Sequence, residues 1–291
     1  AMACATFAIA GCGSDNTKNT ADNSNAVTWS ETFDGTKTDF AVKSSPTHAV
    51  SMSQATTEMM LQLGLEDKMA GTAFKEEEIY PPLQAAYDKV KVLSDKWPSY
   101  EVFMSVKPDF ATGWPDSFSK RAIPADKMIA HKVNIWLPES MLSTKADLET
   151  NFNDMIKLGE IFGVKPKAEE WVAGQRKTLE AIQAKLKDLP RKRVFIYDSE
   201  DGQPFTAFEG YTTNILKLIG ADNVMSGLGV DKTWAKGSWE TVIAQNPDYI
   251  IIAAVKEGHF IRVKLSEITP GVRTVDALKR LAEEIHGVKI D

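Results

Sequence analysis

Residues 144–189 read TKADLETNFNDMIKLGEIFGVKPKAEEWVAGQRKTLEAIQAKLKDL, and their apolar residues recur at the spacing of one helix face. The first helical segment stops near Gly163, and Pro166 suits the first turn of a second one. Strand-like and helix-like runs alternate both before and after this block. We therefore predict an α/β fold in which residues 144–189 form a helical spine between two lobes.

The two flanking segments, residues 29–143 and 190–291, each contain short apolar runs of strand length separated by helical patterns. In the first segment, the strand-like runs are residues 49–52, 69–72, 108–113 and 133–136. In the second segment, the strand-like runs are residues 193–197 and 249–253. Such alternation is typical of mostly parallel sheets, and a cleft between two lobes of this kind is a natural ligand site.

The composition is that of a folded globular protein, with 43% apolar and 25% charged residues. The formal net charge of −6 argues against nucleic-acid binding, which needs basic patches. Only two cysteines occur, Cys4 and Cys12, so we expect neither a disulfide framework nor a cysteine metal site in the body of the chain. The sequence has no nucleophile elbow, P-loop or H-E-x-x-H zinc motif, and we do not expect an enzyme.

Residues 1–12 resemble the end of a secretory signal peptide that lacks its basic start. The tetrapeptide Ile-Ala-Gly-Cys at residues 9–12 matches the lipobox of bacterial lipoproteins, in which small residues precede the cysteine that receives the lipid. Residues 13–28 are rich in Asn, Thr, Ser and Asp and predict a flexible tether. We therefore expect an extracytoplasmic protein that is held on the bacterial membrane only by a lipid on Cys12.

A short pattern occurs once on each side of the spine. In residues 98–110 and again in residues 237–249, Ser-aromatic-Glu is followed, after the same gap, by Pro-Asp-aromatic. The matched gap favours an internal pseudo-symmetry between the lobes. Because Pro-Asp is a frequent turn pair, the repeat is also compatible with coincidence.

Taken in order along the chain, these stretches resemble the solute-binding proteins of ABC importers for ferric siderophores, haem and vitamin B12. The resemblance covers residues 40–291, and its strongest parts besides the repeats are residues 50–58, 63–65, 204–207, 214–224 and 266–273. It implies two Rossmann-like lobes joined by a long helical spine, with the ligand cleft between them. It also implies a protein that captures a metal chelate and delivers it to a permease dimer. We expect a monomer without a cofactor of its own.

The resemblance leaves the cargo open. We expect a ferric siderophore first, and vitamin B12 or haem as alternatives. Direct binding of zinc or manganese is a rival of another class, but the histidines that it would need, His48, His131, His259 and His286, are scattered. We interpret the run of three glutamates at residues 76–78 as a solvated loop, with coordination of a metal ion as the alternative, and we expect no directly bound metal.

The chain departs from the family pattern after Ala253. It reaches residues 255–261 almost at once, whereas family members usually have a further helix and loop there. Either the second lobe is trimmed or this segment is missing from the printed chain. The ligand contacts of the second lobe are the part of the resemblance that this departure weakens.

The resemblance also implies a role for the glutamates of the two repeats. In the family, one carboxylate on each lobe docks onto arginine pockets of the permease, and Glu101 and Glu240 occupy the matching positions. Arginine–carboxylate pairs are bidentate and directional, so two of them would fix the orientation of the complex. The alternative is that both are solvated glutamates that favour the dipole at a helix start.

Chelates of this class are large, often anionic and partly aromatic, so we expect aromatic platforms and a few cationic donors in the cleft. Trp114 follows a strand that ends at Gly113, at the carboxyl edge where open α/β sheets bind ligands. We expect Trp114, Tyr211 and Arg273 to contact the ligand. Further candidates are Phe205, Tyr80, Trp234, Arg121, Trp97 and Trp136. For each aromatic residue, packing in the core is the alternative.

Overall fold

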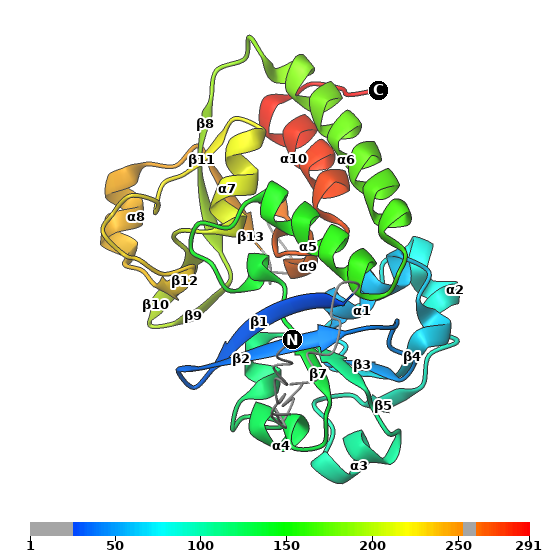
Figure 1. Ribbon diagram of the computed structural model, residues 1–291. Helices are drawn as coiled ribbons and strands as arrows, with labels where there is room; N and C mark the ends of the chain where they lie inside the picture. Colours follow the sequence, from blue (N-terminus) through cyan, green and yellow to red (C-terminus); the bar gives the residue numbers. More distant parts are fainter. Residues whose placement is uncertain (1–25, 253–259) are drawn as a thin grey trace, which may run out of the picture.

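The computed structural model describes residues 26–252 and 260–291. Two α/β lobes are joined by two consecutive helices, α5 (Leu148–Ile161) and α6 (Lys165–Leu186), which form the spine (Figure 1). The last helix, α10 (Thr274–His286), packs against α6. The predicted fold class, α/β with two lobes and a helical spine, is confirmed.

Local features explain why the spine lies where the sequence pattern indicates. Asp147 caps α5 by accepting a hydrogen bond of 2.9 Å from the N–H of Thr150, whose hydroxyl accepts one from the N–H of Asp147. Gly163 follows the end of α5 with a positive φ of 71°. Gly159 permits a close approach between the helices, since a Cβ there would lie 2.8 Å from the Cβ of Ala168.

The first lobe is built on a parallel sheet with the strand order β5-β4-β3-β6-β7. Its strands are β3 (Ala49–Ser51), β4 (Met69–Ala73), β5 (Val92–Ser94), β6 (Phe110–Thr112) and β7 (Asn134–Trp136). Its helices are α1 (Gln54–Gln62), α2 (Gln84–Tyr87), α3 (Tyr100–Ser105) and α4 (Ala125–Ile129). The strand order reverses between β3 and β6, and at such a switch point the loops diverge and leave a crevice for a ligand.

The second lobe has a parallel sheet in the order β11-β8-β13-β14, which matches β4-β3-β6-β7 of the first lobe. Its strands are β8 (Lys192–Tyr197), β11 (Ala221–Asn223), β13 (Tyr249–Ile252) and β14 (Ile261–Arg262). Its helices, besides α10, are α7 (Tyr211–Leu218), α8 (Trp239–Gln245) and α9 (Leu265–Ile268). An antiparallel sheet, which the sequence did not predict, consists of β9 (Ser199–Asp201), β10 (Gln203–Ala207) and β12 (Trp234–Lys236).

The repeated sequence pattern has the same structural role in both lobes. In the first, the Asp109 carboxylate accepts a hydrogen bond of 3.0 Å from the N–H of His48, just before β3. In the second, the Asp248 carboxylate accepts one of 2.8 Å from the N–H of Arg193, in β8. Each aspartate thus joins the start of β6 or β13 to the neighbouring central strand. This equivalence supports a pseudo-symmetry of the lobes rather than a coincidence of turn residues.

The strands alternate their side chains between two faces and thereby divide the core. In β8, Val194 and Ile196 belong to the same cluster as the spine, whereas Phe195 belongs to a cluster on the other face. In β6, Phe110 and Ala111 divide in the same way. The spine cluster continues from the first lobe through α5 and α6 into the second. Because the lobes and the spine share one hydrophobic core, we expect a stiff connection.

The sequence analysis missed a β-hairpin formed by β1 (Val27–Phe33) and β2 (Thr36–Val42). Asp34 and Gly35 make its turn with positive φ angles of 48° and 78°. Asp-Gly is a pair that two-residue hairpin turns favour, so the sequence did contain the signal. The hairpin contacts the edge strand β7 and shields it from other chains.

Several predictions concern segments at the limits of the described residues. Residues 1–12, with Cys12, and residues 253–259, with His259, lie outside them. The predicted tether at residues 13–28 overlaps β1 by two residues, because β1 begins at Val27. No helix in the described part of the chain is both long and apolar enough to cross a membrane.

The connection between β13 and β14 is short. The equivalent strands of the first lobe, β6 and β7, are joined by residues 113–133, which include α4. Residues 253–260 join β13 to β14, although parallel strands normally need a crossover of about a dozen residues or more. Within the residues that the structure describes, the second lobe therefore has no counterpart of α4.

Glu31 of β1 is a buried carboxyl whose titration is linked to folding. Its side chain accepts a hydrogen bond of 2.9 Å from the N–H of Leu137, and the residue is 8% exposed. Burial raises the pKa of Glu31 from 4.5 to about 7, against the opposing effect of that hydrogen bond. Burial also raises the pKa of nearby Asp154 to about 6.

We expect the melting temperature of the protein to fall as the pH rises from about 5 to about 8. A folded-state pKa above the unfolded value means that the contribution of Glu31 to stability is full below its unfolded pKa and is lost as the pH rises through about 7. Glu31→Gln keeps an acceptor for Leu137 and removes the titration, so it should flatten this dependence. Thermal unfolding across the pH range measures the effect. An unchanged pH dependence in Glu31→Gln would contradict it.

Candidate functional site

A cavity of about 440 Å³ lies between the two lobes, at the carboxyl ends of the parallel strands. Phe74 follows β4, Trp114 comes shortly after β6, and Asp198 follows β8, and all three line the cavity. Met141, just before the spine, contributes as well. The cleft between lobes that the sequence predicted is therefore present.

Aromatic side chains form the walls of this cavity and include one stacked pair from each lobe. In the first lobe, the rings of Phe74 and Trp97 stack with their centroids 4.5 Å apart. In the second lobe, the rings of Phe205 and Trp234 stack with their centroids 6.1 Å apart. Trp234 reaches this position because β12 pairs with β10 in the unpredicted antiparallel sheet. Each lobe thus contributes a flat apolar wall of the kind that suits a large, flat ligand surface.

Phe74 is a lining residue that the sequence analysis missed. It has a positive φ of 61°, a region that bulky residues rarely adopt and that costs on the order of 1–3 kcal/mol. The residue lies directly after β4, where its ring stacks on Trp97. No pattern in the sequence marks this conformation, because it depends on the packing of the ring.

Tyr211 lines the cavity but is only 4% exposed. Its hydroxyl lies 2.8 Å from the Thr274 hydroxyl in a buried hydrogen bond, which joins the first residue of α7 to the first residue of α10. Burial raises the pKa of Tyr211 above its usual range. The Tyr211 ring therefore lines the cavity, while the hydroxyl is hydrogen-bonded to Thr274 within the second lobe.

The charged residues that line the cavity are mostly acidic. Four lining residues carry carboxylates, namely Glu76, Asp116, Asp198 and Glu209. Among the described lining residues, Arg121 carries the only positive charge, and it forms an ion pair with Asp116. Glu76 accepts a hydrogen bond of 3.1 Å from the indole N–H of Trp114. Although Glu76 lies at an exposed edge, partial desolvation by the cleft walls raises the pKa of its carboxyl.

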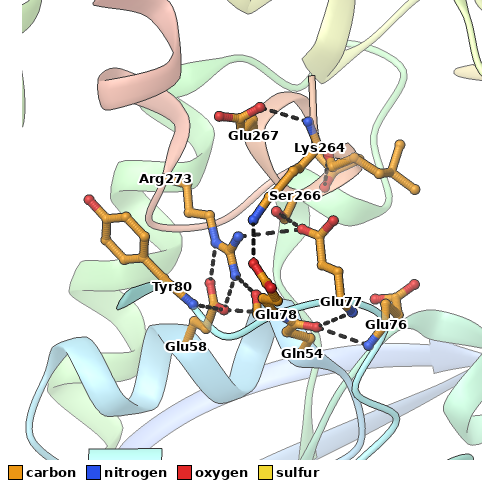
Figure 2. Close-up of polar contacts among 12 residues, drawn as sticks. Gln54, Glu58, Glu76, Glu77, Glu78, Tyr80, Lys264, Ser266, Glu267 and Arg273 are labelled. Carbon is orange, nitrogen blue, oxygen red and sulfur yellow. Dashed lines mark hydrogen bonds and ion pairs between the residues drawn. The ribbon is translucent and has the colours of Figure 1, made fainter. Parts of the chain in front are cut away.

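Arg273 does not line the cavity, which corrects the expectation that it contacts the ligand. The residue is 4% exposed, and its Nε donates to Glu58 of α1 at 2.9 Å (Figure 2). A second guanidinium nitrogen donates to the carbonyl oxygen of Glu78 at 2.8 Å, and a third lies 3.4 Å from a Glu77 carboxylate oxygen. Since Glu58 belongs to the first lobe and Arg273 to the second, this buried ion pair joins the lobes.

Further contacts surround the Glu58–Arg273 pair. The amide of Gln54 donates to Glu58 at 3.0 Å, and the N–H of Tyr80 does so at the same distance. The Tyr80 ring lies 5.5 Å from the Arg273 guanidinium carbon, and its hydroxyl donates to Asp276. Tyr80 is therefore part of the lobe contact and not of the cavity. The expected solvated loop at residues 76–78 instead takes part in this contact (Figure 2).

The structure separates the predicted ligand residues into three groups. Those that line the cavity are Trp114, Tyr211, Phe205, Trp234, Arg121 and Trp97. Those that join the lobes are Arg273 and Tyr80. Trp136, in β7, is buried in the core that faces the spine. The lining carboxylates of Asp198 and Glu209 were missed, because an acidic residue in a loop has no distinctive sequence pattern, and Glu76 was noticed only as part of a solvated glutamate run.

Glu101 and Glu240 occupy equivalent, exposed positions on the two lobes. Each is the second residue of a helix, α3 or α8, whose first turn is capped by a serine. Ser99 accepts from the N–H of Val102 at 3.3 Å, and Ser238 from the N–H of Thr241 at 3.4 Å. Hydrogen bonds from its own backbone N–H and from Ser99 lower the pKa of Glu101. Figure 1 shows α3 and α8 on different lobes, both away from α6.

The described histidines make separate contacts. His131 lies 3.0 Å from the Tyr100 hydroxyl, and His286 lies 2.7 Å from the carbonyl oxygen of Ile219. In the parts of the chain that the structure describes, no three side chains of His, Cys, Asp or Glu are grouped so that they could hold a metal ion. The geometry thus offers no support for direct zinc or manganese binding there.

A family model described as periplasmic binding protein matches residues 50–279. The chain belongs to the periplasmic binding protein family. An uncharacterized ABC transporter substrate-binding lipoprotein of Bacillus subtilis is 26% identical over 98% of this chain and 95% of its own length. A vitamin B12-binding protein of Vibrio vulnificus is 23% identical over 82% of this chain and 90% of its own length. The predicted family is therefore confirmed.

Solved structures of periplasmic binding proteins show the same fold. A periplasmic binding protein from Veillonella parvula is 84% identical, with a TM-score of 0.89 over 91% of this chain and 99% of that one. A Saccharomonospora viridis structure described as an ABC-type Fe3+-hydroxamate transport system is 18% identical, with a TM-score of 0.72 over 89% of this chain and 99% of that one. At that identity, the likeness concerns the fold alone.

Proposed function

We propose that this periplasmic binding protein captures a metal chelate between its lobes and delivers it to the permease of an ABC importer. The observation that carries the proposal is the interlobe cavity with its two stacked aromatic pairs, Phe74–Trp97 and Phe205–Trp234. A metal chelate has a large organic surface that such walls can cover. The relatives include an ABC transporter substrate-binding lipoprotein, which supports the transport role.

A ferric siderophore is the cargo that we favour. The fold is shared with a structure described as an Fe3+-hydroxamate transport system. Vitamin B12 is the second candidate, because the family includes vitamin B12-binding proteins that match most of this chain. Haem is less favoured, since the Tyr211 hydroxyl that could bind haem iron is already bonded to Thr274. Among the described lining residues there is no histidine.

The proposal also includes the location of the protein in the cell. The lipobox at residues 9–12 supports attachment of a lipid to Cys12, which would hold the protein on the outer side of the cytoplasmic membrane. A B. subtilis relative that matches almost the whole chain is named a lipoprotein. The exposed Glu101 and Glu240, one on each lobe, would then face the permease and pair with its arginines.

Titration of the purified protein with ferric trihydroxamates, haem and cobalamin tests the binding role, with tryptophan fluorescence as the readout. We expect saturable quenching by one class of chelate, with a Kd on the order of 1 μM or lower. Trp114→Ala removes an aromatic lining residue and should weaken binding about tenfold or more. Coloured ligands need an inner-filter correction.

The matched control is Trp171→Phe, which changes a tryptophan of α6 that packs on Phe152 and does not line the cavity. It should alter the fluorescence signal but leave the affinity unchanged. If no chelate binds to the wild-type protein, the proposed function is wrong. If Trp114→Ala binds as tightly as the wild type, the ligand site lies elsewhere.

A further inference from the structure

The charges in the cavity are unbalanced toward the negative side. In the described part of the chain, Arg121 is paired with Asp116, which leaves the lining carboxylates of Glu76, Asp198 and Glu209 without a cationic partner on the cavity wall. From this imbalance and the aromatic walls, we infer that the cleft selects a chelate with a net positive charge. The inference rests on the proposed function and names the substrate class of the same site.

The three carboxylates accept hydrogen bonds from neutral donors, and none forms an ion pair with a described lining residue, although the charge of Lys96 acts on Glu76 at longer range. Glu209 accepts hydrogen bonds from the N–H of Gly227 at 2.7 Å and from the Ser226 hydroxyl at 3.0 Å. The Ser199 hydroxyl donates to Asp198 at 2.9 Å. Glu76 accepts the indole N–H of Trp114, as described above. A neutral donor orients a carboxylate, and the negative charge stays available to a ligand.

The carboxylates approach the cavity from both lobes. Glu76 belongs to the first lobe, and Asp198 and Glu209 belong to the second. A cation between the lobes is therefore attracted from two sides, and an anion is repelled from two sides. The stacked rings exclude water and lower the local dielectric, which strengthens both effects. Aromatic faces also attract cations directly through their quadrupoles.

Other cations near the cavity are already engaged. The Arg273 guanidinium is enclosed by Glu58 and Glu77 and is barely exposed. The Lys96 ammonium lies 5.3 Å from the centre of the Phe74 ring, and Lys96 is not among the lining residues. Arg121, which is paired with Asp116, is thus the one cationic donor that the described walls offer to an anionic chelate, fewer than we expected from the sequence.

A charge series of ligands tests the inference on the whole protein. Linear ferric trihydroxamates with a free terminal ammonium, with an acetylated terminus and with a succinylated terminus share the same iron coordination and differ in charge. We expect affinity to fall in that order, by roughly tenfold per step, and the differences to shrink as salt is added. A cationic and an anionic metalloporphyrin of equal size form a second pair, with the same expected order.

Isosteric variants test whether the lining carboxylates cause the preference for cationic ligands. Glu209→Gln keeps an acceptor for Gly227, and Asp198→Asn keeps one for Ser199, so both should fold normally. Each variant should reduce the ratio of affinities between the cationic and the anionic ligand severalfold or more. Asp188→Asn, which removes an exposed carboxylate beyond the end of α6, should leave that ratio unchanged.

The outcomes separate this inference from the proposed function. Binding of neutral or anionic chelates as tightly as the cationic ones would overturn the charge inference and leave the transport role intact. An unchanged charge preference in both Glu209→Gln and Asp198→Asn would overturn it as well. Failure of every chelate, whatever its charge, would contradict the proposed function and the inference together.

Discussion

Arg273→Met is expected to lower the free energy of unfolding by about 3–5 kcal/mol. The substitution keeps much of the side-chain volume but removes both guanidinium donors to Glu58, which is 2% exposed and would keep only the neutral donors of Gln54 and Tyr80. The Glu58 carboxylate would then be buried with its charge uncompensated, and the carbonyl oxygen of Glu78 would lose a donor. Urea denaturation and thermal unfolding measure the loss. Because the pair joins the two lobes, exchange of backbone amides at the start of α10 should also become faster.

The surface pair Arg176–Glu149 provides a matched control. Both of its side chains are about half exposed, with relative exposures of 46% and 55%, whereas those of Arg273 and Glu58 are 5% and 3% exposed. Arg176→Met should cost less than about 1 kcal/mol, because water screens the charges that remain. The double variant Glu58→Leu/Arg273→Met should recover much of the loss, since it buries no lone charge. Equal costs for the two single arginine variants would contradict the interpretation of Arg273 as a lobe contact.

The double variant Glu101→Gln/Glu240→Gln is expected to retain ligand binding and to lose most of its uptake activity. If each carboxylate pairs with arginines of the permease, the loss of one charge costs about 2 kcal/mol or more at a desolvated contact, or roughly thirtyfold. Both residues are exposed and neither lines the cavity, so the Kd for the chelate should not change. Uptake of labelled chelate by cells that express the permease, compared with fluorescence titration of the same variants, separates the two effects.

Glu180→Gln is the control for this experiment, because Glu180 is an exposed helical glutamate of α6 in the spine. It should support normal uptake. Each single variant at Glu101 or Glu240 should fall between the wild type and the double variant. If the double variant transports as well as Glu180→Gln, the two glutamates are solvated helix-start residues, which is the alternative reading of the repeat.

Local sequence patterns predicted the framework of the molecule. The helical spacing of residues 144–189 corresponds to α5 and α6, and Gly163 marks the break between them. The two Pro-Asp repeats start β6 and β13, the equivalent central strands. Trp114 reaches the cavity because residues after the carboxyl end of a parallel strand face the cleft, a rule that needs no knowledge of distant residues. The hairpin turn at Asp34 and Gly35 carried a readable signal that was missed.

The roles of the charged residues were not predictable in the same way. Arg273 was expected to meet a ligand, but its carboxylate partner Glu58 lies 215 residues earlier in the chain. The pairing of Arg121 with Asp116 likewise depends on how the loop after β6 folds back. Phe74 becomes a wall of the cavity only through its left-handed backbone and its contact with Trp97.

The sequence by itself determined the α/β class, the spine, the repeat and the family, because periodicity, capping and turn residues act over a few neighbouring positions. The tertiary structure alone decided which charges cancel and which remain in the cleft. The charge of Arg273 is neutralised by its ion pair with Glu58, whereas the carboxylates of Glu76, Asp198 and Glu209 line the cavity. The physical reason is that electrostatic energy depends on separation and burial, and both are set by contacts between residues that are far apart in the chain.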